Sequence, residues 1–127
     1  VLFRNEGDGT FTDVSGLLGI DGSQGNGLGV VWADFDEDGR PDIFVANDGN
    51  PNHLFLGTDA GGFDEAAKAR GVYLAEDGNT RAGMGVVSAD PDNDGDLVYL
   101  TRLQWDIDRV ERDYPEVKLT ATKEMMV

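Results

Sequence analysis

The chain has 127 residues, of which 25 are acidic and 10 basic, giving a formal charge of −15, and it contains no cysteine. This acidity argues against binding nucleic acid, which needs a basic face, and against docking by charge to anionic lipid. The chain is about one domain long, with 39% apolar residues and no run long enough to span a membrane, so we expect a globular protein without membrane insertion.

The first half of the chain predicts four short strands. Leu2–Asn5 and Thr10–Val14 flank Glu6–Gly9, where glycine supplies the positive φ that tight hairpin turns need. Leu28–Ala33 and Asp42–Ala46 are rich in Val, Ile, Phe and Trp and are bounded by Gly, Asp, Asn and Pro, which is typical of strands joined by turns.

The pattern repeats along the chain. Residues 2–13 align with residues 54–65 at an offset of 52, and residues 27–39 align with residues 83–95 at an offset of 56. Two units, about 1–50 and 51–100, each have the size of a four-stranded propeller blade. We therefore predict an all-β fold of about two propeller-type blades, a partial β-propeller. Two blades cannot close a ring, so the chain is part of a longer propeller, associates with other copies, or exposes edge strands.

An acidic loop separates the third and fourth predicted strands. Asp34, Asp36 and Asp38 occupy positions 1, 3 and 5 of the loop, Arg40 offers its carbonyl at position 7, and Asp42 occupies position 9. Calcium binds six to eight oxygens, and such a loop wraps carboxylates around one ion. Without a cation these carboxylates repel one another. The loop predicts a site for calcium or a similar hard cation, with a solvated acidic turn as the alternative.

The loop differs from an EF-hand, which shares its opening. An EF-hand has a bidentate Glu at position 12 and lies between helices. Position 12 here is Val45, and the flanking segments are predicted strands. We therefore predict a calcium site of the strand–loop–strand type.

A second, weaker copy of the loop follows. Its ninth position is Val98, and the strand after it suggests that a residue or two has been lost just beyond the loop. Reduced affinity is expected rather than none. The predicted ligands of this copy are Asp90, Asp92, Asp94 and Asp96.

Residues 101–127 depart from the repeat. Leu103, Ile107, Val110 and Tyr114 lie on one face of a predicted short helix that Pro115 would end. A strand is predicted after it. This segment is interpreted as a cap on the last blade, with a partner-docking helix or a segment lacking a native partner as alternatives.

No catalytic or cofactor-binding residue is indicated. Nucleophilic catalysis needs a Ser–His–Asp or Cys–His set, and the spacing of the three serines and of His53, the single histidine, marks none. Trp32 and Trp105 are expected in the core rather than as carbohydrate platforms. We predict that the chain is not an enzyme.

These motifs resemble a known family. The segments Leu2–Val14, Gly27–Gly39 and Val45–Gly49 look like the FG-GAP (VCBS) repeat, especially the subgroup found in ASPIC/UnbV-type and cartilage-acidic-protein-like proteins. The resemblance covers about residues 1–100. It implies integrin-α-like propeller blades and a secreted or cell-surface location, which in a bacterium would be periplasmic or secreted.

The resemblance also implies a role for calcium. It matches Asp34, Asp36, Asp38 and Asp42 to the family's calcium ligands, while Val98 departs from the pattern in the second copy. We therefore expect an extracellular calcium-binding module for adhesion, recognition or scaffolding, with an unidentified protein or glycan ligand. The alternative is a non-catalytic accessory segment of a larger secreted enzyme.

Overall fold

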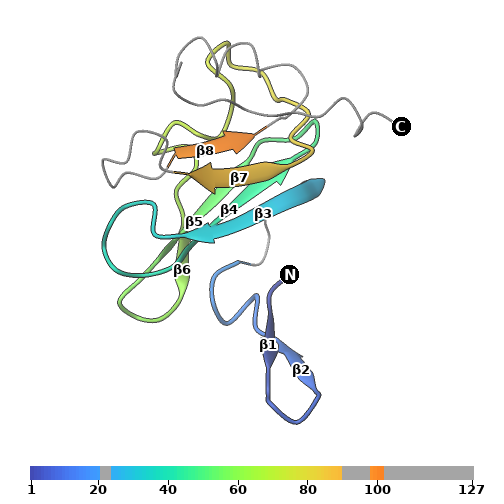
Figure 1. Ribbon diagram of the computed structural model, residues 1–127, viewed down its shortest axis with the longest axis vertical. Coiled ribbons are helices and arrows are strands. Elements are labelled where there is room, and N and C mark those ends of the chain that lie inside the picture. Colours follow the sequence, from blue (N-terminus) through green and yellow to red (C-terminus); the bar gives the residue numbers. More distant parts are fainter. Residues whose placement is uncertain (21–23, 90–97, 102–127) are drawn as a thin grey trace.

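The computed structural model describes residues 1–20, 24–89 and 98–101, and this part of the chain is all-β (Figure 1). The predicted helix and strand within residues 101–127 lie almost wholly outside the described residues. The eight strands are β1 (Phe3–Asn5), β2 (Phe11–Asp13), β3 (Gly27–Ala33), β4 (Asp42–Asn47), β5 (His53–Gly57), β6 (Phe63–Glu65), β7 (Val86–Ala89) and β8 (Val98–Thr101).

The strands form three antiparallel sheets. Strands β1 and β2 make a separate hairpin, β3-β4-β5-β6 form a four-stranded meander, and β7 and β8 form a second pair. Figure 1 shows β7–β8 beside the four-stranded sheet, whereas the β1–β2 hairpin lies at the opposite end of the molecule. The four-stranded sheet has the strand number of one complete propeller blade, and each two-stranded sheet has that of half a blade.

The complete blade is out of phase with the sequence repeat. Its first two strands, β3 and β4, come from the first repeat, and its last two, β5 and β6, come from the second. Strands β4 and β5 join the two halves in the register Ile43↔Phe55, Phe44↔Leu54 and Val45↔His53. The hairpin β1–β2 is therefore the counterpart of β5–β6, and β7–β8 is the counterpart of β3–β4.

The register of β7–β8 corrects one expectation from the sequence. Ala33 pairs with Asp42 in the complete blade, and Ala89 pairs with Val98 in the next one. Both members of the second pair stand 56 residues after their counterparts, so the loop between β7 and β8 has the same length as the first. The expected loss of a residue or two is wrong. Val98 therefore occupies the ninth position of the second loop, where the first loop has Asp42.

The core lies between the complete blade and its neighbours. Phe44, Ala46, Leu54 and Ala67 form its buried cluster, and Val86 of β7 packs against it among the partly buried side chains. Strand β4 is central in the sheet and is mostly buried along its length, which explains its nearly continuous apolar sequence.

The other face of β3 is open. Leu28, Val30 and Trp32 alternate along this strand and are all exposed, Trp32 to 49%. Trp32 packs edge-on against Phe63 at 6.0 Å between ring centroids. The expectation that Trp32 is a core residue is therefore wrong in this chain, while Trp105 lies outside the described residues.

No helix in the described part of the chain is long and apolar enough to cross a membrane.

Candidate metal centre

The loop between β3 and β4 curls around the carboxylate of Asp34. Glu37 and Gly39 adopt left-handed conformations, with φ of 60° and 83°. These turns aim backbone amides inward, so Asp38 N–H donates to Asp34 Oδ1 at 3.1 Å and Gly39 N–H donates to Asp34 Oδ2 at 2.8 Å. The predicted strand–loop–strand arrangement is confirmed, since β3 ends at Ala33 and β4 begins at Asp42.

Asp42 closes the loop from the first position of β4. It is fully buried, with 0% exposure. Its Oδ2 accepts a 2.7 Å hydrogen bond from Phe35 N–H, and its Oδ1 accepts a 2.8 Å bond from Gly57 N–H on β5. Charge-assisted bonds of this kind are about twice as strong as neutral ones. Asp42 thus ties the two ends of the loop to each other and to the next strand.

Three carboxylates converge at this point. Oxygens of Asp34, Asp36 and Asp42 lie within 4.8 Å of one another. Asp36 Oδ2 accepts a bond from the Arg70 guanidinium at 3.3 Å, but the buried Asp36 Oδ1 has no hydrogen-bond partner. A buried acceptor without a partner is unfavourable, and a cation held by the three carboxylates would satisfy it. The donor set, all carboxylate oxygen, fits a hard cation.

The other two predicted ligand residues, Asp38 and Arg40, bind each other. Asp38 accepts hydrogen bonds from the backbone N–H and the guanidinium of Arg40. Arg40 also donates to Gly57 O at 3.0 Å and to Asp59 at 2.7 Å. The structure therefore places Asp38 beside the three-carboxylate cluster, bound to Arg40. Ligand roles for the Asp38 carboxylate and the Arg40 carbonyl stay predictions.

Sequence reasoning missed three groups that shape the centre. Arg70 reaches Asp36 from 34 residues away, and Gly57 N–H reaches Asp42 from 15 residues away. Phe35 supplies an N–H to the centre and its side chain to the core. The spacing of residues within the loop does not predict these hydrogen-bond partners, because strand pairing brings them in from distant parts of the chain.

The surroundings of Asp36 disfavour the ionised form of its carboxyl. Burial raises the pKa of the Asp36 carboxyl above its ordinary value, and the charges of Asp38 and Asp42 raise it further, while Arg70 partly offsets them. A carboxylate in this state gains by binding a cation. Elsewhere, hydrogen bonds from the Arg81 side chain and Asn79 lower the pKa of the exposed Asp77 to about 2.

Replacing Asp36 by Asn is expected to change the pH dependence of stability in a chelator. A group with a raised folded-state pKa contributes stability at low pH that is lost as pH rises through that pKa. Near neutral pH, Asp36→Asn should therefore unfold at a higher temperature than the unsubstituted chain, and the difference should vanish as pH falls below the ordinary range for Asp. Thermal melts of both proteins across the acid range measure this difference. A variant less stable at pH 7 would contradict it.

Residues 90–97 of the second acidic loop lie outside the described residues. The backbone register of β7–β8 still places Val98 where the first loop has the buried Asp42. The second loop therefore lacks the carboxylate that ties the first loop to its neighbouring strand. Metal ligation by Asp90, Asp92, Asp94 and Asp96 stays a prediction.

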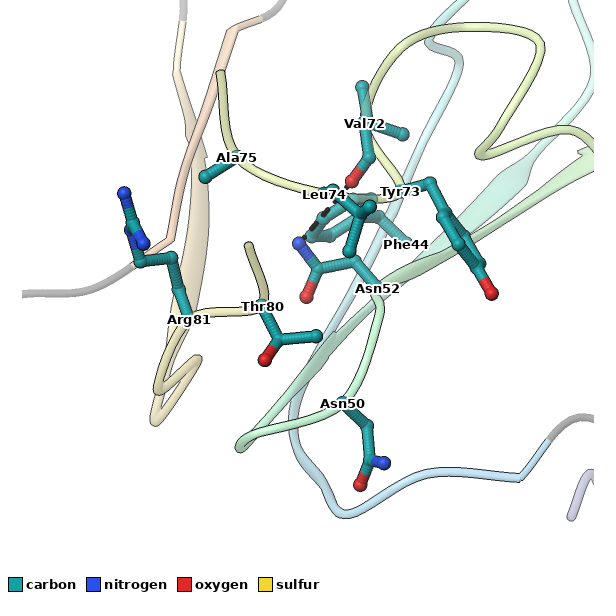
Figure 2. Close-up of a pocket in the computed structure, with 9 residues that line it drawn as sticks. All are labelled: Phe44, Asn50, Asn52, Val72, Tyr73, Leu74, Ala75, Thr80 and Arg81. Atoms are coloured by element: carbon teal, nitrogen blue, oxygen red, sulfur yellow. Dashed lines mark hydrogen bonds between the residues drawn. The ribbon is translucent and has the colours of Figure 1, made fainter. Parts of the chain in front are cut away.

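A pocket of about 180 Å³ lies where residues of the 71–81 segment meet Phe44 of β4 (Figure 2). Asn52 donates to Val72 O at 3.4 Å beside Phe44, at its floor. Ligand sites for small organic molecules are generally about 300–1,000 Å³, so this pocket is undersized for such a molecule. The residues that line it are Phe44, Asn50, Asn52, Val72, Tyr73, Leu74, Ala75, Thr80 and Arg81.

The chain is similar to known repeat proteins. The family model described as FG-GAP-like repeat matches residues 1–45 and 34–101. Cartilage acidic protein 1 of Xenopus tropicalis is 36% identical over 96 residues, and the proteins of that name from Mus musculus and Homo sapiens are each 35% identical over 96 residues. Each of these alignments covers 76% of this chain and 14% of the relative. The chain thus spans a small part of the length of these relatives.

Proposed function

The chain belongs to the FG-GAP-like repeat family, and we propose that it is a non-catalytic, extracellular repeat module that calcium stabilises for recognition of a protein or glycan. The observation that carries the calcium part is the buried, unpartnered Asp36 Oδ1 among three converging carboxylates. The extracellular part rests on the family and on its relatives named Cartilage acidic protein 1.

Asp34, Asp36 and Asp42 would hold the ion. When bound, it supplies positive charge that removes the repulsion among these carboxylates. The chain's own contribution is orientation: backbone N–H groups of the loop fix Asp34, while Phe35 and Gly57 fix Asp42. Little rearrangement is then required on binding, which favours affinity.

Calcium acts in this proposal on stability rather than on chemistry. A ligand that binds only the folded chain adds RT ln(1 + [Ca]/Kd) to the free energy of unfolding. For a Kd of about 10⁻⁴–10⁻³ M, typical of extracellular modules, millimolar calcium adds on the order of 1 kcal/mol. Such a site is filled outside the cell and holds rigid the loop that joins β3 to β4.

Calorimetric titration of calcium into chelator-treated protein tests the site directly. We expect binding with a Kd of about 10⁻⁴–10⁻³ M, at least tenfold weaker binding in Asp34→Asn, and unchanged affinity in Asp64→Asn. The control changes an equally charged but exposed side chain on β6. Equal losses in both variants would show that calcium responds to the net charge of −15 rather than to this cluster.

A further inference from the structure

An arginine from a distant segment of the chain lies against the carboxylate cluster. Arg70 stands 34 residues after Asp36, and its guanidinium donates to Asp36 Oδ2 at 3.3 Å. This ion pair joins the loop between β3 and β4 to the segment that follows β6. The carboxylate whose Oδ1 is buried without a partner among the described residues is therefore the one that also holds an arginine.

The backbone that carries Arg70 is anchored in the core. Ala67 is fully buried and belongs to the core cluster. Its N–H donates to Glu65 Oε1 at 3.2 Å, and Arg70 N–H donates to Ala66 O at 2.9 Å, so residues 66–70 form one turn. None of these contacts involves a carboxylate of the cluster. The base of the Arg70 side chain therefore stays beside the cluster when the charge of the cluster changes.

A second arginine near the cluster has different partners. Arg40 binds Asp38 and also donates to Gly57 O at 3.0 Å and to Asp59 Oδ1 at 2.7 Å. Asp38 and Asp59 lie outside the group of three converging carboxylates. Of these two arginines, Arg70 is therefore the one whose charge acts directly on a member of that group.

Arg70 and a bound calcium ion would be attracted by the same carboxylate. The oxygens of Asp34, Asp36 and Asp42 lie within 4.8 Å of one another, so their negative charges repel. Without an ion, the guanidinium offsets part of this repulsion. A divalent cation among the carboxylates would instead meet the guanidinium as a like charge at close range, which is unfavourable.

The Arg70 guanidinium is free to move away from the cluster. Its side chain is 53% exposed, whereas the Asp36 side chain is 18% exposed. Water screens an ion pair with an exposed partner and hydrates the charge that is released, so such a pair contributes little to stability. Whether calcium displaces Arg70 from Asp36 or leaves it nearby, the arginine makes calcium binding weaker than at the same carboxylates without it.

We propose that Arg70 is a built-in counter-ion of the cluster, which steadies the calcium-free loop and weakens calcium binding. This role rests on the proposed calcium site and identifies a group that sets its affinity. Ligand charge is one of the properties that tune the affinity of calcium sites, and weak sites are typical of extracellular modules. When calcium is withdrawn, Asp36 keeps a positive charge beside it.

Calorimetric titration of calcium into chelator-treated Arg70→Gln tests this role. We expect calcium to bind about three- to tenfold more tightly than in the unsubstituted chain, because a positive charge has left the cluster. Arg81→Gln is the matched control and should leave the affinity unchanged, since Arg81 pairs with Asp77, which lies outside the three carboxylates. Arg70→Lys keeps the charge and should bind within about twofold of the unsubstituted chain.

Thermal melts give a second readout, which a merely structural arginine would not change. In chelator, Arg70→Gln should melt at a lower temperature than the unsubstituted chain, because repulsion among the carboxylates is less offset. Its calcium-dependent rise in melting temperature should exceed that of the unsubstituted chain and of Arg81→Gln, because tighter binding adds more to the free energy of unfolding. A lower melting temperature with an unchanged calcium-dependent rise would contradict the counter-ion role.

The titrations separate the role of Arg70 from the existence of the calcium site. Unchanged or weaker binding in Arg70→Gln would overturn the counter-ion role while leaving the site in place, and weaker binding would show that the arginine orients Asp36 for the ion. Equal tightening in Arg70→Gln and Arg81→Gln would also overturn it, since calcium would then respond to net charge alone. No calcium binding in any of the four proteins would overturn the site itself, and the counter-ion role with it.

Discussion

Asp42→Ala is expected to lower the free energy of unfolding by about 3 kcal/mol even without calcium, because two N–H groups lose their acceptor. Asp42 is fully buried and accepts bonds from Phe35 at 2.7 Å and Gly57 at 2.8 Å. A buried donor left unpaired costs about 1–3 kcal/mol. The same substitution also removes a carboxylate of the cluster, so the calcium response should be lost as well.

Urea unfolding in chelator and in calcium measures both effects of Asp42→Ala. Asp59→Ala is the matched control, since the Asp59 side chain is 95% exposed and its pairing with Arg40 is a surface ion pair worth about 0–1 kcal/mol. A loss in Asp42→Ala no larger than in Asp59→Ala would show that the closure of the loop onto β5 contributes little to stability.

Phe44→Ala is expected to lower the free energy of unfolding by about 3–5 kcal/mol, as emptying a large core site does. Phe44 is 0% exposed, stands in the middle of the central strand β4, and packs with Ala46, Leu54 and Ala67. Phe44→Leu keeps much of the apolar volume and should lose clearly less.

The two substitutions differ in what calcium restores. Phe44 contributes no ligand atom to the cluster, so Phe44→Ala should retain the calcium-dependent increment in its melting temperature, measured from the lower starting point. Asp42→Ala should retain none. If Phe44→Ala also loses the increment under conditions where circular dichroism shows it folded, calcium binding depends on core packing as well as on the carboxylates.

The sequence predicts the loop well because the information is local. The alternating aspartates and the flanking strands of residues 28–33 and 42–46 lie within twenty residues, and the structure has strands at both places. Val45 at position 12 excluded an EF-hand for a local reason too. Periodicity and spacing are read over such distances.

What the sequence did not predict depends on contacts between distant segments. The pairing of β4 with β5 crosses the repeat boundary, so the repeat units did not reveal that the complete blade spans both. Arg70 beside Asp36 and Gly57 beside Asp42 follow from that pairing. Trp32 stays half-exposed although Phe63 of β6 packs edge-on against it, which depends on the neighbouring strands rather than on residue type.

The central claim is that the cluster around Asp36 is a structural calcium site, and thermal melts of the unsubstituted chain and Asp36→Asn in chelator, magnesium and calcium test it most directly. Asp36 Oδ2 accepts its bond from the Arg70 side chain, whereas backbone N–H groups hold Asp34 and Asp42, so the change of Asp36 to Asn leaves the Asp34 and Asp42 contacts in place. We predict a calcium-selective rise of about 2–8 °C for each kcal/mol gained, in the unsubstituted chain alone. An equal rise in Asp36→Asn, or no rise in either protein, would contradict the account.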